Sequence, residues 1–322
     1  MNFSIKEFLK AVPIPMCGLI LGTVSLGNLL FSEGFEKVGN AFCSIGFLIM
    51  MLIMLKIIFT FKHTLADLKN PIVASVSPTF TMAWMVICAF LNRLLPGSAI
   101  VSGIWVAAVI LHLVLMLYFI VAHIFPVKVT LESIYPSWFI TFVGIGVIPN
   151  TSGAFVEELG EFFVWAALIL YFILLPVIIK RVIDSEKMAD SAIPLTTILT
   201  APGSLCLAGY LSVFKEASLP FVVGLLILSQ LIYFSILLYF RKMLKVGFYP
   251  SYAAFTFPLV ISATAVFKVS KFFEGSPVAT VTTWLSIFET LAAILVVCYV
   301  LTKYFIYFHA QAKALRLKHE YE

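Results

Sequence analysis

The chain alternates between long apolar runs and short polar connections over nearly its whole length. Each apolar run has about 20 residues, the length that an α-helix needs to cross the hydrocarbon core of a bilayer. The fifth run is short and is interrupted by a proline at position 149, so a re-entrant segment is the alternative there. The pattern predicts ten membrane-spanning helices, at residues 11–31, 38–61, 71–91, 99–124, 136–155, 160–183, 194–214, 219–240, 248–267 and 278–307.

Prolines recur along this pattern at a spacing of roughly sixty residues, which is the length of two spans with their connections. One proline stands at the start of each odd-numbered span: Pro13, Pro71, Pro136, Pro194 and Pro250. Basic residues mark the far end of the repeated unit with a similar spacing. The repeat therefore predicts five helical hairpins.

The two helices of each predicted hairpin differ in composition. The first is rich in Gly, Ser, Thr and Pro, whereas the second carries bulky apolar runs such as 47–52 and 225–228. Small residues let helices approach closely, and large apolar side chains suit contact with lipid. We therefore expect an all-α membrane protein in which odd-numbered helices form an inner ring around a passage and even-numbered helices form an outer ring. The alternative is a compact bundle whose hydroxyl groups bond only to neighbouring helices.

Composition supports a membrane protein and excludes a soluble globular one. Of 322 residues, 62% are hydrophobic and only 11% are charged, and the mean hydropathy is +1.08; soluble domains have about a quarter of their residues charged. No stretch is long enough for a separate soluble domain. We expect one transmembrane domain over residues 1–322, with a short basic cytoplasmic tail at 308–322, and no nucleic-acid partner.

Basic residues are distributed unequally between the two sides of the predicted bundle. The loops that follow even-numbered spans, together with the termini, hold Lys6, Lys10, Lys62, Lys69, Lys128, Lys180, Arg181, Lys187, Arg241, Lys242, Lys245, Lys313, Arg316 and Lys318. The other side holds Lys37, Arg93, Lys215, Lys268 and Lys271. By the positive-inside rule, both termini are expected in the cytoplasm, which requires an even number of spans.

Few ionisable residues fall inside the predicted spans, and all of these lie on even-numbered helices. Lys56 is near the cytoplasmic end of its span and can extend its ammonium group to the membrane surface. His112 reads either as a neutral histidine bonded to another helix or as a proton relay. Glu289 reads either as an interhelical contact or as a proton-coupling carboxylate.

Odd-numbered spans carry almost no formal charge, and none of them contains Asp or Glu. This argues against cation selectivity by an acidic ring, and leaves anions as plausible permeants. The five cysteines lie in apolar runs without paired spacing, so neither a disulfide nor a metal site is expected. The motifs of phosphate loops, zinc hydrolases and serine hydrolases do not occur, so the sequence predicts no enzyme and no cofactor.

The ninth span contains a proline break beside aromatic residues. Pro258 frees a backbone carbonyl in an apolar segment, where such a break is tolerated only against protein or a watery cavity. Phe257 directly precedes this break, and Phe255 stands two residues earlier. The segment is therefore a candidate pore element.

With these features assembled, the chain resembles the tellurite-resistance/dicarboxylate transporter family. This family includes bacterial TehA proteins, fungal malate and sulfite transporters and plant guard-cell slow anion channels. The resemblance covers about residues 13–307, and the fifth span matches only loosely. The residues that carry it are Pro13, Pro15, Gly18 and Gly22; Asn70, Pro71, Ser77, Pro78 and Thr81; Pro136 and Ser137; Ala201, Pro202, Cys206, Tyr210 and Ser212; and Phe255, Thr256, Phe257 and Pro258.

The resemblance implies a homotrimer in which each protomer has its own pore, anionic substrates, and a phenylalanine that plugs the pore midway. The matching residue is Phe257, with Phe255 as the alternative. We expect a multi-pass protein of the bacterial cytoplasmic membrane that contacts lipid and small anions. The residues expected to line the pore are Gly18, Gly22, Ser77, Pro78, Thr81, Gly144, Gly146, Thr200, Pro202, Ser204, Thr256, Pro258 and Ser262.

Three functional hypotheses follow, of which the last, an integral membrane enzyme or receptor, would apply if the purified protein showed no anion flux in liposomes. The first is an anion channel or facilitative transporter for small inorganic anions or small carboxylates, gated by Phe257. The second is a proton-coupled carrier of C4-dicarboxylates, sulfite or tellurite, in which Glu289 or His112 titrates during the cycle.

Overall fold

The computed structural model describes residues 5–184 and 188–320. Within these residues the chain is helical and contains no strand. Residues 1–4, 185–187 and 321–322 lie outside the described part, and so does Lys187 of the predicted charge asymmetry. The prediction of an all-α membrane protein is confirmed.

Five long helices form the outer part of the molecule and correspond to the even-numbered spans. Only 28 to 39% of the most apolar window of each is buried, because bulky side chains such as Leu48 and Leu238 point outwards. These helices are α3 (Glu36–Phe59), α7 (Ala99–Phe119), α10 (Glu157–Asp184), α12 (Leu219–Met243) and α14 (Pro277–Glu320).

The odd-numbered segments lie inside this outer layer, and each is broken into shorter pieces. Three of them pass as apolar spans, and 72 to 94% of their windows is buried. This difference in burial is consistent with the expected arrangement of inner and outer helices. The inner pieces are α1 (Ile5–Ala11) and α2 (Met16–Ser32); α5 (Pro71–Val76) and α6 (Thr79–Leu94); α8 (Trp138–Val143), η3 (Gly144–Gly146), α9 (Val147–Thr151) and η4 (Ser152–Ala154); η5 (Asp190–Thr200) and α11 (Ala201–Val213); and η6 (Pro250–Phe255) and α13 (Thr256–Phe272).

Three short elements complete the described chain. The helix α4 (Phe61–Asp67) follows α3, the π-helical turn η1 (Ile120–Ile124) extends α7, and the 3-10 turn η2 (Leu131–Ser133) lies before the third inner segment. At the start of α5, the side chain of Asn70 accepts hydrogen bonds from the backbone N–H groups of Ile72 and Val73. This cap, followed by Pro71, fixes where the helix begins.

The described residues contain eight helices that are long and apolar enough to cross a membrane. The first inner segment adds a ninth if α1 and α2, which are bent by 79°, form one span. The fifth predicted span, 136–155, is built from four short helical pieces, none of which has the length of a span. The glycines of η3 and Pro149 in α9 interrupt it, because each disfavours a continuous helix. Ten crossings are consistent with this arrangement.

Glycines in the left-handed region mark three of the hairpin turns. Gly34 joins α2 to α3, Gly97 joins α6 to α7 and Gly275 joins α13 to α14, with φ angles of 93°, 72° and 86°. Glycine adopts such angles without the steric cost that a side chain would add. At each of these three turns the chain reverses direction, and the inner helix is followed by the outer helix beside it, as the hairpin repeat predicts.

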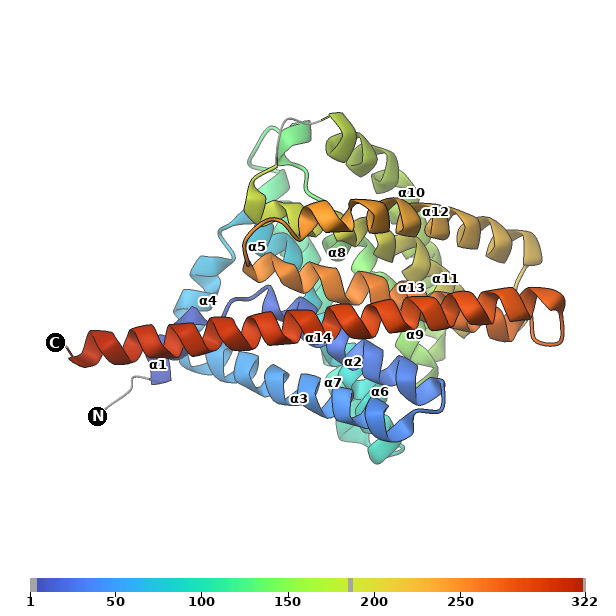
Figure 1. The fold of residues 1–322 in the computed structure, drawn as a ribbon, viewed down its shortest axis with the longest axis horizontal. Helices are drawn as coiled ribbons and strands as arrows, with labels where there is room; N and C mark the ends of the chain where they lie inside the picture. Colours follow the sequence, from blue (N-terminus) through green and yellow to red (C-terminus); the bar gives the residue numbers. More distant parts are fainter. Residues whose placement is uncertain (1–4, 185–187, 321–322) are drawn as a thin grey trace.

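Both ends of the described chain lie at the same end of the molecule (Figure 1). The hydroxyl of Tyr307 in α14 donates a hydrogen bond of 3.3 Å to the carbonyl of Ala11, and the rings of Phe8 and Phe308 are 5.8 Å apart. An even number of crossings requires such an arrangement. From residue 308 to Glu320 the predicted tail continues α14 without a break.

Candidate functional site

A small cavity lies at the centre of the inner ring. Its volume is about 50 Å³, and all five inner segments contribute to its wall. Gly18 comes from α2, Thr79 from α6, Gly144 from η3, Pro202 from α11 and Phe257 from α13. One chain therefore encloses an axial space by itself.

Larger cavities lie on either side of the central one. An inner-mouth cavity of about 380 Å³ shares Pro15 and Ser251 with the central cavity. An outer cavity of about 210 Å³ shares Leu205 and Phe257 with it. The three cavities are thus in series, and the side chains of Leu205 and Phe257 form the partition between the centre and the outer cavity.

The backbone at Phe257 is held tightly against α2. The Thr256 hydroxyl donates to the carbonyls of Ala253 (2.7 Å) and Gly18 (3.1 Å), which joins the break between η6 and α13 to the first inner segment. A methyl group on Gly22 would lie only 2.8 Å from the backbone nitrogen of Phe257, so glycine permits this approach. Phe257 itself is buried, with 7% of the residue exposed, and it lines both the central and the outer cavity.

Phe255 has different surroundings. It is fully buried, with its ring centroid 5.0 Å from that of Phe240 on α12 and 4.9 Å from that of Tyr252. It does not line any of the three cavities. Of the two candidate gate residues, only Phe257 faces the passage.

Of the six hydroxyl groups expected to line the pore, that of Ser262 accepts a hydrogen bond from Gln230, and that of Ser204 has no partner among the described residues. The other four bond within their own segments. Each donates to the backbone carbonyl three residues before it, at positions where the inner helices begin or break: Ser77 to Ala74 (2.8 Å), Thr81 to Pro78 (2.8 Å), Thr200 to Thr197 (3.0 Å) and Thr256 to Ala253 (2.7 Å). None of these four residues lines the three cavities. Their hydroxyls instead donate hydrogen bonds to backbone carbonyls, for which no water is present as a partner in a membrane interior.

The remaining predicted lining residues divide into two groups. Four line the central cavity: Gly18, Gly144, Pro202 and Pro258. The others are buried in contacts between segments: Gly22 against Thr256, Gly146 against Leu205, Ser262 beside Gln230, and Pro78 and Ser204 in the surrounding core.

The wall of the central cavity is largely apolar. Thr79 and Ser251 are its hydroxyl-bearing residues. Thr79 already donates to the carbonyl of Val76 (2.7 Å), whereas the Ser251 hydroxyl is buried without a partner in the described part of the chain. Ser251 is therefore the free polar group at the boundary of the inner-mouth and central cavities.

Three cations that the sequence pattern assigns to the outer loops lie on inner helices, namely Arg93, Lys268 and Lys271. The predicted spans end at 91 and 267, but α6 continues to Leu94 and α13 to Phe272. Arg93 and Lys268 therefore stand on the last turns of these helices, and both line the outer cavity. The turn glycines at 97 and 275 could have indicated from the sequence that these two helices extend further, because a glycine commonly follows the last turn of a helix.

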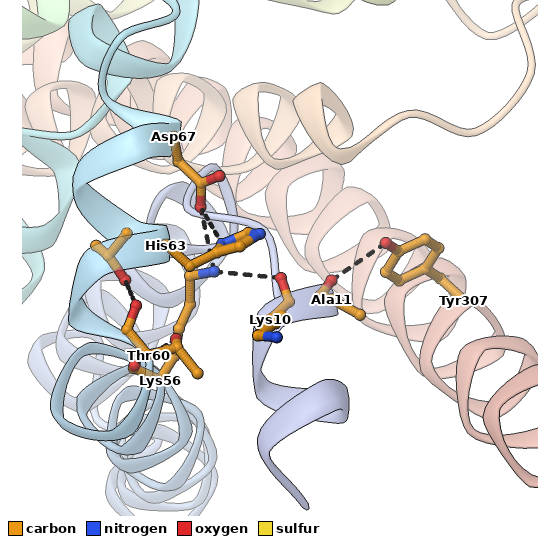
Figure 2. A network of polar contacts seen from close by, with 8 residues as sticks. Lys10, Ala11, Lys56, Thr60, His63, Asp67 and Tyr307 are labelled. Carbon is orange, nitrogen blue, oxygen red and sulfur yellow. Dashed lines mark hydrogen bonds and ion pairs between the residues drawn. The ribbon is translucent and has the colours of Figure 1, made fainter. Parts of the chain in front are cut away.

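A polar network lies beside the inner-mouth cavity, to whose lining it contributes Lys10 and Asp67 (Figure 2). Lys56 is 1% exposed, and its ammonium group lies 3.2 Å from Asp67 Oδ2 and 3.4 Å from the carbonyl of Lys10. His63 Nδ1 lies 3.4 Å from the same Asp67 oxygen. Lys56, which the sequence suggested would reach the membrane surface, is instead paired with a carboxylate that lines the cavity.

The two residues considered for proton coupling are buried outside the passage. His112 Nδ1 is 2.8 Å from the Thr81 hydroxyl, while Nε2 has no partner among the residues that the structure describes. Glu289 lies on α14 and is fully buried beside Gln230 of α12 and Ser262 of α13. Neither residue lines any of the three cavities.

Comparison with known proteins gives the family of the chain. Residues 11–305 match the voltage-dependent anion channel family. The chain belongs to this family. Two relatives from Methanocaldococcus jannaschii are each described as an uncharacterized transporter. One is 27% identical over 256 residues, covering 70% of this chain and 73% of its own; the other is 27% identical over 237 residues, covering 65% and 68%.

The match spans all five inner segments from the last residue of α1 onwards, so the passage and its partition lie within the family region. An anion channel or transporter is a membrane protein that binds and releases its substrate without covalent chemistry. The described residues contain no cluster of His, Cys, Asp and Glu that could hold a metal ion.

Proposed function

We propose that this member of the voltage-dependent anion channel family passes small inorganic anions or small carboxylates through a pore within each protomer, and that the ring of Phe257 closes it. The observation that carries the proposal is the place of Phe257 between the central and outer cavities. Opening requires this ring to swing out of the path.

The charges along the passage support anions as the permeant. Among the described residues, the outer cavity is lined by Arg93 and Lys268 and by no carboxylate. At the inner mouth, Asp67 is the carboxylate that the described part of the chain contributes to the lining, and it is paired with Lys56. A narrow passage with low-dielectric walls concentrates ions opposite in sign to its lining charges.

The central test is anion flux into liposomes that contain wild-type protein or the Phe257→Ala variant. The variant is expected to increase flux about tenfold, which corresponds to lowering the barrier by about 1.4 kcal/mol. A reversal-potential series in chloride, nitrate, sulfite and malate identifies the preferred anion. Flux in the variant no higher than in wild type would rule out Phe257 as the gate.

Phe255→Ala is the matched control. It removes the same atoms two residues away, from a ring that packs on Phe240 and Tyr252 outside the passage. Loss of this ring lowers stability, since removing a buried Phe costs about 3–5 kcal/mol, but flux per folded protein is expected to stay at the wild-type level. Equal activation by both variants would point to loosened packing as the cause.

A proton-coupled carrier is the second candidate, and Glu289 is the observation in its favour. Its side chain is fully buried beside the polar side chains of Gln230 and Ser262, and buried carboxyl groups in membrane spans commonly serve proton coupling. Counterflow exchange, and a reversal potential that shifts with pH and ceases to shift in Glu289→Gln, would support it. A conductance linear in voltage and indifferent to pH would favour the channel.

For the assembly and location, we propose a homotrimer in a cytoplasmic membrane with both termini on the cytoplasmic side. The unequal distribution of basic residues along the sequence supports this orientation. The closeness of α1 to the C-terminal part of α14 agrees with this orientation, because both ends of the described chain then lie on one side of the molecule (Figure 1).

A further inference from the structure

The outer cavity brings together two basic side chains from different inner helices. Arg93 reaches it from the last turns of α6, and Lys268 from the last turns of α13. These residues are 175 positions apart in sequence, but they line the same space of about 210 Å³. Phe257 forms part of the wall of this cavity, on the side of the central cavity.

Arg93 is held in place by contacts that leave part of its guanidinium group free. Its Nη1 donates to Asn28 Oδ1 at 2.7 Å and its Nη2 to Cys43 Sγ at 3.7 Å, and the group lies 4.2 Å from the ring centroid of Phe31. Its Nε is buried and has no partner in the described chain. Since a guanidinium group has five N–H donors, capacity for a further acceptor remains.

Lys268 is also anchored by neutral groups only. Its ammonium group donates to the carbonyl of Ala208 at 3.2 Å and to the Ser212 hydroxyl, both on α11. An ammonium group has three N–H donors, so one remains for another acceptor. These contacts orient the charge but do not neutralise it.

No carboxylate compensates the two charges. Among the described residues, neither Arg93 nor Lys268 forms an ion pair, and the lining of the cavity contains no Asp or Glu. Glu33, which directly follows the end of α2, accepts a hydrogen bond from Thr290 and lines a different groove. Two uncompensated cations at a low-dielectric boundary repel each other, and a bound anion relieves this cost.

Most other polar side chains around the cavity already use their donors. Asn28 Nδ2 donates to the carbonyl of Val86, and Asn150 Nδ2 donates to the carbonyls of Gly146 and Leu205. The hydroxyl of Thr264 donates to the carbonyl of Val260. The free donors in the outer cavity are therefore concentrated on the two cations.

We infer that the outer cavity is a binding site for one small inorganic anion of the halide or nitrate class, held between Arg93 and Lys268 directly above the Phe257 partition. The volume is below the range of roughly 300–1,000 Å³ typical of pockets for larger organic ligands, which favours a small anion with part of its water shell. Anion binding in the outer cavity does not depend on the proposed function. Only the statement that the bound anion is the one that permeates rests on that function.

The test measures bromide binding to the full-length protein in detergent, from the rise of its unfolding temperature with bromide concentration in a gluconate buffer. A ligand that binds only the folded state stabilises it in proportion to the logarithm of its concentration. In Lys268→Gln the apparent dissociation constant for bromide is expected to rise about tenfold, the change produced by losing one modest charge interaction. Lys268→Arg, which keeps the charge, is expected to retain binding.

Lys271→Gln is the matched control, because it removes one cation from the same helix less than one turn away. Lys271 is exposed, lies near Glu274, and lines other grooves than the outer cavity. The control is expected to bind bromide like wild type. If Lys268→Gln and Lys271→Gln show the same bromide dependence as wild type, the site does not exist.

A second measurement separates this site from the transport proposal. Anomalous diffraction from bromide-soaked crystals is expected to show bromide in the outer cavity of wild type and none there in Lys268→Gln. Bromide bound at Lys268 in a protein that shows no flux, even as Phe257→Ala, would overturn the transport proposal and keep the site. Flux in Phe257→Ala with no bromide in the cavity would overturn the site and keep the transport proposal.

Discussion

At the scale of single residues, the two phenylalanines of the ninth span show how the spacing of two residues along the chain determines which neighbours each side chain contacts. Two residues along a helix are rotated by about 200° relative to each other. Phe257 faces the passage, and Phe255 accordingly contacts Phe240 on the outer helix α12. The resemblance named Phe257 first, with Phe255 as the alternative, and of the two only Phe257 lies in the wall of the central cavity.

The pair between Lys56 and Asp67 gives the first prediction at this scale. Asp67→Asn would leave a buried ammonium group with the Lys10 carbonyl as its remaining close acceptor. Because Asp67 keeps some contact with solvent, with 28% of its side chain exposed, we expect a loss of roughly 2–3 kcal/mol in the free energy of unfolding, below the upper range for fully buried pairs. Chemical denaturation in detergent measures this loss.

The double variant Lys56→Met/Asp67→Asn is expected to recover part of that stability, because no unpaired charge remains. Glu274→Gln serves as the control, since its partner Lys271 is 4.0 Å away and both side chains are exposed. Such exposed pairs contribute about 0–1 kcal/mol. An Asp67→Asn protein as stable as Glu274→Gln would show that the pair at the inner mouth does not hold the fold.

At the scale of elements, the inner segments are stabilised at their breaks by local hydroxyl groups. Thr81, Thr200 and Thr256 each donate to the carbonyl three residues earlier. A broken helix inside a membrane needs such partners, because no water is present to replace the missing helical hydrogen bonds. This explains why the first helix of each hairpin is rich in Ser and Thr although the central cavity itself is largely apolar.

Gly22 on α2 supplies the prediction for this scale. The added methyl group in Gly22→Ala would meet the backbone of α13 at Phe257, which has no flexible end that can move aside. We expect the unfolding free energy to fall by about 1–3 kcal/mol, the usual cost of overpacking. The matched control is Gly224→Ala on α12, where a methyl group meets no atom within 4 Å. Equal stability of the two variants would mean that α2 and α13 do not need this close contact.

At the scale of the whole molecule, the passage is formed by one chain. All five inner segments line the central cavity, and the long α14 extends across the outer surface (Figure 1). No residue from another copy is required to complete the wall. Each protomer of the proposed trimer should therefore conduct independently.

This independence can be measured by co-expressing wild-type and Phe257→Ala chains in known ratios and reconstituting the mixed assemblies. Flux is expected to rise linearly with the fraction of the variant, because each open pore contributes by itself. Wild type mixed with Phe255→Ala is the control and should stay at the basal level. A steep rise, seen only when most chains carry Phe257→Ala, would indicate a pore shared between subunits.

Much of the architecture could be predicted from the sequence. The proline repeat at Pro13, Pro71, Pro136, Pro194 and Pro250 identified the inner segments, because proline breaks and small residues suit helices buried among others and bulky residues suit lipid. The site was less predictable. Ser77 and Thr200 were expected on the passage because they are polar, but a hydroxyl can equally bond to its own backbone, and composition does not distinguish these two uses.

The sequence alone determined that this chain is a helical membrane protein with inner and outer helices, since apolar length and the distribution of small residues act locally along the chain. The tertiary structure decided which side chains face the passage. Arg93 and Lys268 both line the outer cavity because α6 and α13 each extend beyond the apolar run. Helix rotation and convergence depend on packing between distant segments, and a linear pattern of hydropathy does not contain that information.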